Sequence, residues 1–314
     1  MLLLLRRKLR MTAVLATALA ATLLGVPDGG TGTARAEEKP PTDRQLLFYN
    51  HSYGVLDRET ADAIEHSDYL PKFADFEVRT TTGSQGTWTG RYLKGRETYL
   101  ELFGVGDLPG TEHGSAGLAV STERDGDFAT VLERLRDAGI EKPIEGVQTR
   151  DFGDGVPVPW FDFIFTTDQY DAFGAWAMEY RPEYFADPRG KTEPASHPGD
   201  VGRERYLPDT YRERLMRDVT SVRFAVTERD LDNTVPLLRA GGFRVREVAG
   251  GVVAGGGGTT IRLDTAPRDR AGLKRFTFAL NKAAERRHVE RIGNSTLTVG
   301  PGARAVWDFT GGER

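Results

Sequence analysis

The stretch Thr-Tyr-Leu-Glu-Leu-Phe-Gly at residues 98–104 places one acid inside an apolar run and is typical of a short β-strand. Side chains alternate between the two faces of a strand, so Glu101 shares one face with Tyr99 and Phe103. An isolated carboxylate on a buried strand is unfavourable unless it is paired, protonated or bound to a metal ion. Glu101 is therefore the first candidate for a functional side chain.

A histidine fifty residues earlier lies in a similar apolar run. Residues 46–55, Leu-Leu-Phe-Tyr-Asn-His-Ser-Tyr-Gly-Val, predict a strand that carries His51, and a helix is expected over residues 58–73. Both imidazole and carboxylate can bind a metal ion or move a proton. The pair of His51 and Glu101, on two strands of one unit, is the main functional lead.

The pattern strand, helix and three strands recurs along the chain and predicts an α+β fold of three β-α-β-β-β units. The expected strands are 46–55, 76–81, 87–94 and 98–103, then 117–122, 145–152, 160–166 and 173–180, then 220–226, 245–253, 259–263, 273–280 and 296–309. The expected helices are 58–73, 127–138 and 230–240. We expect units one and two to pair over residues 46–185, a linker at 186–218 and the third unit at 219–310.

The segment from residue 181 to 216 differs from the repeats in composition. It is rich in Pro, Asp, Arg and Gly, and we interpret it as a crossing linker with a short helix near residues 210–217. Its length makes it a candidate lid or domain connection.

Three short motifs resemble those of the vicinal oxygen chelate superfamily, the glyoxalase and bleomycin-resistance type of fold. They are Asn50-His51-Ser52 followed by Asp57, Tyr99-Leu100-Glu101-Leu102-Phe103, and Gly117-Leu118-Ala119-Val120. The chain also resembles an uncharacterised family of exported proteins from high-GC bacteria. The superfamily resemblance implies that units one and two form a cup, with the third unit packed against it.

The resemblance also implies a metal site inside that cup. Matching the slots of the superfamily gives the ligands His51, Glu101 and Glu179, whereas the fourth slot falls near Gly117 or Leu118, which offer no side-chain ligand. The implied cofactor is a divalent ion such as Zn²⁺, Mn²⁺, Fe²⁺ or Ni²⁺, and Glu179 or Glu101 would move a proton.

Each of these residues also has a purely structural interpretation. His51 can be a core histidine whose ring nitrogens bind the backbone. Glu101 can pair with Arg91 or Arg96 of the preceding hairpin. Glu179 can be a solvated residue at a sheet edge.

The N-terminus has the pattern of a signal peptide. Residues 6–10 are basic, residues 11–26 are apolar, and Ala34-Arg35-Ala36 fits a cleavage site that leaves Glu37 as the mature N-terminus. An uncleaved membrane anchor is the alternative. We expect a secreted protein with a flexible lead-in at residues 37–45 and no attachment to the membrane after cleavage.

Composition narrows the function classes further. The chain of 314 residues contains no cysteine, which excludes disulfides, thiolate metal sites and thiol nucleophiles. Its formal net charge of −4 argues against a general nucleic-acid binder. The first hypothesis is a metal-dependent lyase, isomerase or dioxygenase that acts on a small molecule. The alternatives are a non-catalytic small-molecule-binding protein and a structural protein with a decayed metal site. The oligomeric state stays open.

Overall fold

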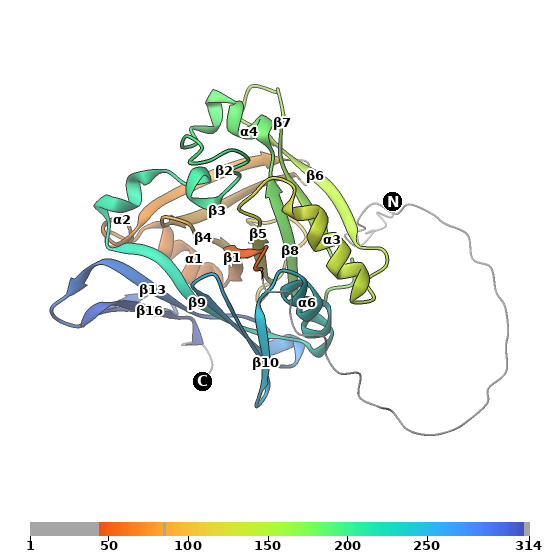
Figure 1. The fold of residues 1–314 in the computed structure, drawn as a ribbon. Helices are drawn as coiled ribbons and strands as arrows, with labels where there is room; N and C mark the ends of the chain where they lie inside the picture. Colours follow the sequence, from red (N-terminus) through yellow and green to blue (C-terminus); the bar gives the residue numbers. More distant parts are fainter. Residues whose placement is uncertain (1–43, 84–85, 311–314) are drawn as a thin grey trace, which may run out of the picture.

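The computed structural model describes residues 44–83 and 86–310 and confirms the mixed α+β class. Two eight-stranded sheets dominate the molecule, one in the upper part of Figure 1 and the other below it. The predicted signal peptide lies outside the described residues, as does most of the predicted lead-in.

The first sheet is a closed barrel with the strand order β1-β4-β3-β2-β6-β7-β8-β5. Its strands are β1 (Phe48–Leu56), β2 (Asp75–Gly83), β3 (Gly86–Lys94), β4 (Tyr99–Gly104), β5 (Ala116–Ser121), β6 (Ile144–Asp151), β7 (Val158–Phe165) and β8 (Phe173–Tyr180). β1 pairs in parallel with β4 and antiparallel with β5. Among the described residues, two residue pairs between β2 and β6 close the barrel, Thr82 with Asp151 and Gly83 with Arg150.

The expected helix over residues 58–73 is interrupted in its middle. Helix α1 (Arg58–Glu65) begins after Asp57, whose carboxylate accepts a hydrogen bond of 2.8 Å from the Thr60 amide, as an N-cap does. The short helix α2 (Leu70–Phe73) follows separately. The Ser67 hydroxyl accepts from the Leu70 amide, so a local side-chain bond starts a new turn there. In the second half of the barrel, helix α3 (Asp127–Asp137) lies close to its predicted range.

Residues 181–215 cross from the barrel to the second sheet, and we call them the strap. The strap contains α4 (Pro182–Ala186), the 3₁₀ turns η1 (Pro188–Gly190) and η2 (Asp209–Glu213), and α5 (Arg203–Tyr206). The prediction of a helix reaching residue 217 was wrong, because the buried Met216 and Val219 already belong to the next strand.

The second sheet is open and has the strand order β10-β11-β12-β9-β13-β16-β15-β14. Its elements are β9 (Met216–Val226), α6 (Glu228–Ala240), β10 (Arg244–Val248), β11 (Gly251–Gly256), β12 (Thr259–Thr265), η3 (Arg268–Arg270), β13 (Gly272–Ala284), β14 (His288–Ile292), β15 (Ser295–Val299) and β16 (Gly302–Asp308). The chain thus supplies β9-α6-β10-β11-β12 and then four strands without a helix after β13.

Two ranges that were each predicted as one strand of this sheet contain two strands joined by a turn. The range 245–253 contains a turn at Gly250, whose φ of +75° favours glycine, and the range 296–309 turns at Gly300, whose φ is +66°. The charged stretch around His288 forms the edge strand β14.

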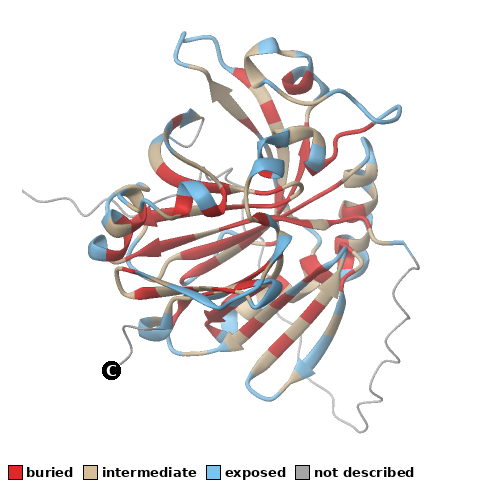
Figure 2. Cartoon of the chain, turned by 90° about the vertical axis from the view of Figure 1, so that its left-hand side faces the viewer, coloured by how far each residue is buried: buried red, intermediate tan, exposed pale blue. Residues whose placement is uncertain are grey.

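The two sheets share one hydrophobic core. Leu100 and Leu102 of β4 belong to the same buried cluster as Val222 and Phe224 of β9 and Phe276 of β13. Along the strands of the second sheet, buried positions alternate with exposed ones (Figure 2). The helices α3 and α6 contact each other on this shared side. In the described ranges, the helices are too short or too polar to cross a membrane.

Candidate functional site

His51 lies in the interior of the barrel, at the middle of β1. Its ring stacks on Tyr99 with ring centroids 4.3 Å apart and meets the edge of Trp176 at 5.4 Å. Its Nδ1 is 2.8 Å from the side-chain oxygen of Asn50. The imidazole is only 4% exposed, and burial lowers its pKa to about 3. His51 is therefore neutral, as a core histidine is, with a side-chain rather than a backbone partner.

Glu101 faces the same interior, because it is next to Tyr53 in the register of β1 and β4. Burial raises the pKa of its carboxyl to about 7, an effect that Arg79 partly offsets. Within residues 44–83 and 86–310, no hydrogen bond reaches the carboxylate of Glu101. Its side chain is only partly buried, so part of it remains accessible to solvent.

The predicted arginine partners of Glu101 are elsewhere. Arg91 pairs with Leu102 in the register, so its side chain points to the outer face, where it binds Glu65 and Asp107 at 2.5 Å each. Arg96 lies in the turn before β4 and pairs with Glu97. The ion-pair interpretation of Glu101 with these two arginines was wrong.

The arginine that lowers the pKa of Glu101 is Arg79 of β2. Arg79 lies over the ring of Tyr92, 4.5 Å from its centroid, and binds Glu77 at 2.7 Å. Glu77 also binds Lys94, at 3.3 Å, and no ion pair joins Arg79 to Glu101 among the described residues. Arg79 therefore offsets the burial of Glu101 only in part.

Glu179 does not join the other two residues, which corrects the predicted ligand set and proton-transfer role. Its carboxylate accepts hydrogen bonds from the Thr122 hydroxyl at 2.8 Å and from the amides of Gly126 and Phe128 at 3.2 Å each. These groups surround the start of α3, so Glu179 caps that helix from the outer face of β8. It is 7% exposed and is not a solvated edge residue either.

Parity along β8 explains the error. Trp176 contacts His51 inside the barrel, and a residue three positions later must point outward. In the first strand of the second unit, Gly117 pairs with Tyr53 across β1 and β5. A Cβ at Gly117 would lie 2.1 Å from the ring of Tyr53, so that ring fills the space of a fourth ligand.

The residues present do not fit the implied divalent metal ion. In the described ranges, no three His, Asp or Glu side chains are grouped as a metal site requires. His51 and Glu101 remain as two separated interior groups, each beside aromatic rings rather than beside a third ligand.

The strap closes one side of the barrel with an aromatic plug. Tyr206 of α5 stacks on Tyr180 with ring centroids 4.4 Å apart and contacts Tyr99 and Trp160 at 6.1 and 6.3 Å. The indole nitrogen of Trp160 is buried and has no hydrogen-bond partner in the described chain. The barrel interior is therefore aromatic, with a few polar groups that the protein itself leaves unsatisfied.

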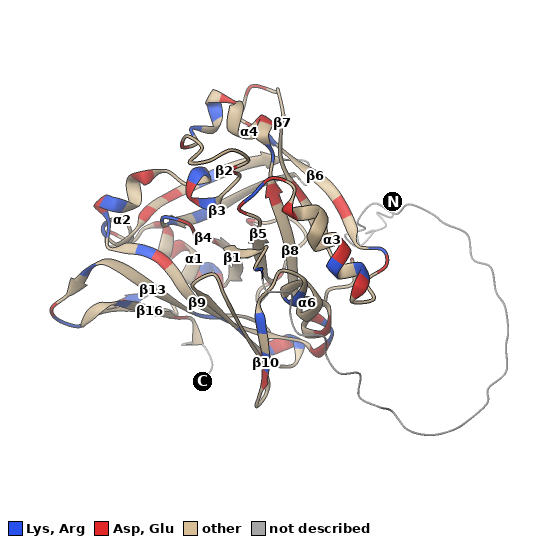
Figure 3. Ribbon diagram, viewed as in Figure 1, with Lys and Arg blue, Asp and Glu red and all other residues tan. Residues whose placement is uncertain are grey.

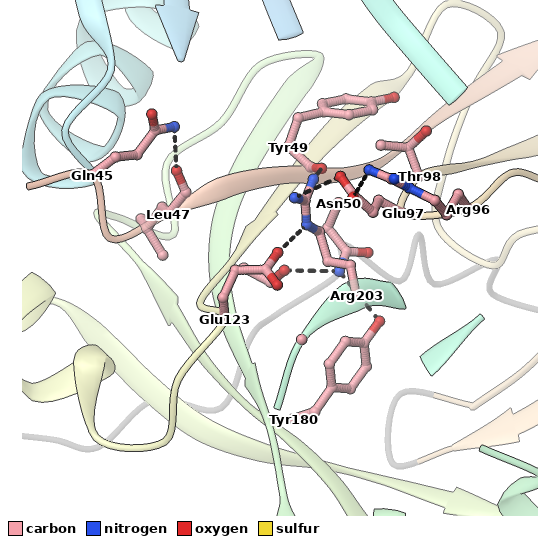
Figure 4. A network of polar contacts seen from close by, with 12 residues as sticks. Gln45, Leu47, Tyr49, Asn50, Arg96, Glu97, Thr98, Glu123, Tyr180 and Arg203 are labelled. Atoms are coloured by element: carbon pink, nitrogen blue, oxygen red, sulfur yellow. Dashed lines mark hydrogen bonds and ion pairs between the residues drawn. The ribbon is translucent and has the colours of Figure 1, made fainter. Parts of the chain in front are cut away.

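Arg203 anchors the strap (Figure 4). Its guanidinium is 4% exposed and donates to the backbone oxygen of Tyr49 at 2.5 Å, to Glu123, and to Glu97 at 3.3 Å. Asn50, beside His51, donates to the hydroxyl of Tyr180 at 3.3 Å in the same region. The buried cation therefore ties the strap to strand β1, which carries His51. Sequence analysis missed this contact, because Arg203 is one of several arginines in a polar segment.

The second sheet carries a charged hollow that sequence reasoning missed. Side chains of β9, β12, β13 and β16 line a hollow of about 430 Å³ on its exposed face. These are Ser221, Arg223, Arg262, Arg275, Thr277 and Arg304. The available signal was a repeated triplet of apolar residue, arginine and apolar residue at 222–224 and 261–263.

Several solved structures are similar to this chain. A hypothetical protein from Staphylococcus aureus is 11% identical with a TM-score of 0.49, covering 81% of this chain and 98% of its own. The 2,3-dioxygenase LapB from Pseudomonas sp. KL28 is 11% identical with a TM-score of 0.41 and coverages of 83% and 91%. An extradiol ring-cleaving dioxygenase from B. fuscum is 12% identical with a TM-score of 0.36 and coverages of 73% and 57%. Since all three TM-scores are below 0.5, no activity is inferred from them.

The sequence itself provides the assignment to a family. No curated protein matches the chain. The family model described as "Family of unknown function (DUF5829)" matches residues 49–309, which include both sheets and the strap. The chain therefore belongs to the DUF5829 family.

Proposed function

We propose that this protein binds a small organic cation inside the closed barrel, with Glu101 as the counter-charge. The observation that carries the proposal is a partly accessible carboxylate on the aromatic interior face of the barrel that receives no hydrogen bond from the described chain. A buried carboxylate without donors is unfavourable, and a cationic ligand would remove that penalty.

Aromatic walls favour the same class of ligand. A cation is attracted to the faces of tyrosine and tryptophan rings, and quaternary ammonium groups bind in cages of such rings. Tyr53 is next to Glu101 in the register, and its pKa is raised to about 12 by burial and by the charge of Glu101. The charge of Glu101 also contributes to the raised pKa of Tyr99 and Tyr206, after burial. These rings therefore surround the carboxylate.

Binding is better supported than metal-dependent catalysis. The resemblance to the vicinal oxygen chelate superfamily implies a lyase, isomerase or dioxygenase, whose ion would need a third ligand where this chain has Glu179 facing outward. We propose that the fold of that superfamily is kept here and that its interior serves a ligand rather than an ion.

The test compares choline with its neutral isostere 3,3-dimethylbutan-1-ol, by titration calorimetry and by tryptophan fluorescence, since Trp176 lines the interior. We expect choline to bind at least about tenfold more tightly than the isostere, and Glu101→Gln to remove that preference. Glu145→Gln is the matched control, since Glu145 is a half-exposed residue of β6 in the same barrel. Equal affinity for the two compounds, or an unchanged preference in Glu101→Gln, would contradict the proposal.

We also propose that the mature protein begins at Glu37 and acts outside the cytoplasmic membrane. The basic, apolar and small-residue regions of residues 1–36 support this. N-terminal sequencing of the protein from the culture medium should begin at Glu37, and an intact N-terminus in the membrane fraction would contradict cleavage.

A further inference from the structure

Arginines cross the exposed face of the second sheet at a single level of its register. Neighbouring residues of successive strands share a face, and the pairing connects Arg246, Val253, Arg262, Arg223, Arg275, Asp308, Thr296 and Arg291 in this order. Five of these eight positions are arginine. Lys and Arg positions are visible as blue segments on β9 and β10 in Figure 3. This concentration of positive charge stands out in a chain whose formal net charge is −4.

The centre of the row is the hollow of about 430 Å³. Arg262, Arg223 and Arg275 lie on three adjacent strands at one level, so their backbones are spaced by about 5 Å from strand to strand. Ser221 and Thr277, paired across β9 and β13, form the next level, and Arg304 lies beyond them on β16. Two hydroxyl groups are therefore flanked by guanidinium groups on both sides.

The acids of this face do not balance its arginines. Asp264 binds both Arg223, at 2.5 Å, and Arg262, at 2.7 Å. Asp308 binds Arg275. Arg304 is exposed, and its guanidinium has neither a hydrogen bond nor an ion pair with any described residue. Four guanidinium groups thus share two carboxylates, which leaves an excess of two positive charges in the hollow.

The polar groups between the arginines are available for a ligand. Thr277 is 8% exposed, and its hydroxyl makes no hydrogen bond within the described residues. The same holds for the hydroxyl of the half-buried Ser221. Both hydroxyl groups are open to solvent beside four arginines, so they can donate to a ligand with acceptor oxygens.

These arginines have no evident role in folding. The neighbours Val222, Phe224 and Phe276 are fully buried on the opposite face and supply the packing. Exposed ion pairs contribute little to stability, typically about 0–1 kcal/mol each. A planar guanidinium donates two parallel hydrogen bonds to an oxyanion, and this geometry suits phosphate particularly well.

We propose that the exposed face of the second sheet binds a small phosphate monoester, with Arg223, Arg275 and Arg304 around the phosphate and the hydroxyls of Ser221 and Thr277 as further donors. The excess of two positive charges matches a dianion. The hollow is also much larger than a phosphate group, which leaves room for the organic part of the ester. This site is separate from the barrel interior and does not depend on the function proposed for it.

The test uses the mature full-length protein and measures binding of inorganic phosphate, phenyl phosphate, sulfate and citrate by titration calorimetry at constant ionic strength set with KCl. We expect saturable binding of phosphate and tighter binding of phenyl phosphate. Arg304→Ala removes one positive charge and should weaken the binding of phosphate and of phenyl phosphate by about tenfold. Arg304→Glu places a negative charge beside the anion and should abolish the binding of both. Folding is not at risk, since Arg304 has no partner among the described residues.

The matched control is Arg212→Ala, an exposed arginine of η2 that is 61% exposed and lies outside the hollow. It should bind phosphate as the wild type does. The proposal is overturned if the wild type shows no saturable heat with any of the four anions, if citrate binds more tightly than phenyl phosphate, or if Arg304→Glu binds phosphate as well as Arg212→Ala does.

Discussion

The barrel and the second sheet have the same order of strands, but only the barrel closes. Read from β2, the barrel order is β2-β3-β4-β1-β5-β8-β7-β6, and the second sheet has β10-β11-β12-β9-β13-β16-β15-β14 in the same positions. The end strands β2 and β6 pair, whereas β10 and β14 do not. The helix that follows β5 has no counterpart after β13, so β13 runs antiparallel to β16 where β5 runs parallel to β8.

Whether a sheet closes into a barrel determines which side chains lie on its face away from the helices. In the barrel that face is enclosed, so a charge there must be rare, and the side chains are mainly aromatic around His51 and Glu101. In the open sheet the same face meets water, so arginines such as Arg223 and Arg304 remain hydrated. One architecture thus gives an aromatic interior in one half and a cationic surface in the other.

The largest expected effect concerns the strap, which belongs to the barrel and has no counterpart over the described part of the open sheet. Arg203→Ala removes the buried donor of the Tyr49 backbone oxygen and of the half-buried Glu123, and should lower the free energy of unfolding by about 3–4 kcal/mol in urea denaturation. Arg212→Ala, the exposed control, should change it by less than about 0.5 kcal/mol. Equal losses in both variants would show that the strap does not stabilise the barrel.

The next effect is a pair of opposite pH dependences inside the barrel. The folded pKa of His51 is lowered to about 3 from 6.5, so its contribution to stability is lost as the pH falls below 6.5. The folded pKa of Glu101 is raised to about 7 from 4.5, so stability is lost as the pH rises from 4.5 to 7. Relative to the wild type, His51→Gln should gain stability toward pH 4.5, and Glu101→Gln should gain it toward pH 7.

The free energy of unfolding of each variant should differ from that of the wild type by up to about 3 kcal/mol over the pH range named for that variant. The basis is about 1.4 kcal/mol for each unit by which the pKa is shifted. Urea denaturation at pH 4.5, 5.5, 6.5 and 7.5 measures it, with Glu145→Gln as the half-exposed control. If the two variants differ from the wild type with the same sign of pH slope, the two groups are not buried as described.

Two strand glycines, one in each sheet, differ in the space around them. A Cβ at Gly117 of β5 would lie 2.1 Å from the ring of Tyr53, whereas a Cβ at Gly255 of β11 would meet nothing within 4 Å. Gly117→Ala should therefore destabilise by about 1–3 kcal/mol through overpacking. Gly255→Ala should be neutral or stabilise by up to about 1 kcal/mol, because alanine has fewer unfolded conformations. Thermal unfolding of the two variants checks this, and an equal loss in both would contradict the difference in packing.

The smallest effect is expected on the arginine face. Arg223→Ala and Arg275→Ala each remove an ion pair between an exposed arginine and a partly buried aspartate. Each should change the free energy of unfolding by at most about 1 kcal/mol. Thermal and urea unfolding without anions measures this. A loss above about 3 kcal/mol in either variant would mean that these arginines hold the sheet together.

The sequence was informative where one strand decided the outcome. Alternation in residues 98–104 correctly placed Glu101 on the face of Tyr99, and the helix expected from residue 58 does begin there, after Asp57. The predicted ligand role of Glu179 was wrong. Glu179 was matched to Glu101 because the residues around the two are similar, but a shift of one residue along a strand moves a side chain to the other face of the sheet. The interior residues beside that slot are Met178 and Tyr180, which the sequence does not distinguish from core residues.

Contacts between residues of distant strands could not be predicted from the sequence. Arg223, Arg262 and Arg275 are visible as arginines between apolar residues, but their common level depends on the pairing of β12, β9 and β13. The contact of Arg203 with Glu97 and Glu123 likewise joins residues that are 106 and 80 positions apart.

The unpaired end strands of the second sheet have a consequence for the solubility of the protein. An exposed strand edge offers free backbone groups to other chains and promotes aggregation unless charges block it. β10 has the exposed Arg244, Arg246 and Glu247, and β14 has His288, Glu290 and Arg291 along a strand of five residues. Short, charged edges of this kind disfavour edge-to-edge addition, so the sheet can remain open without polymerising.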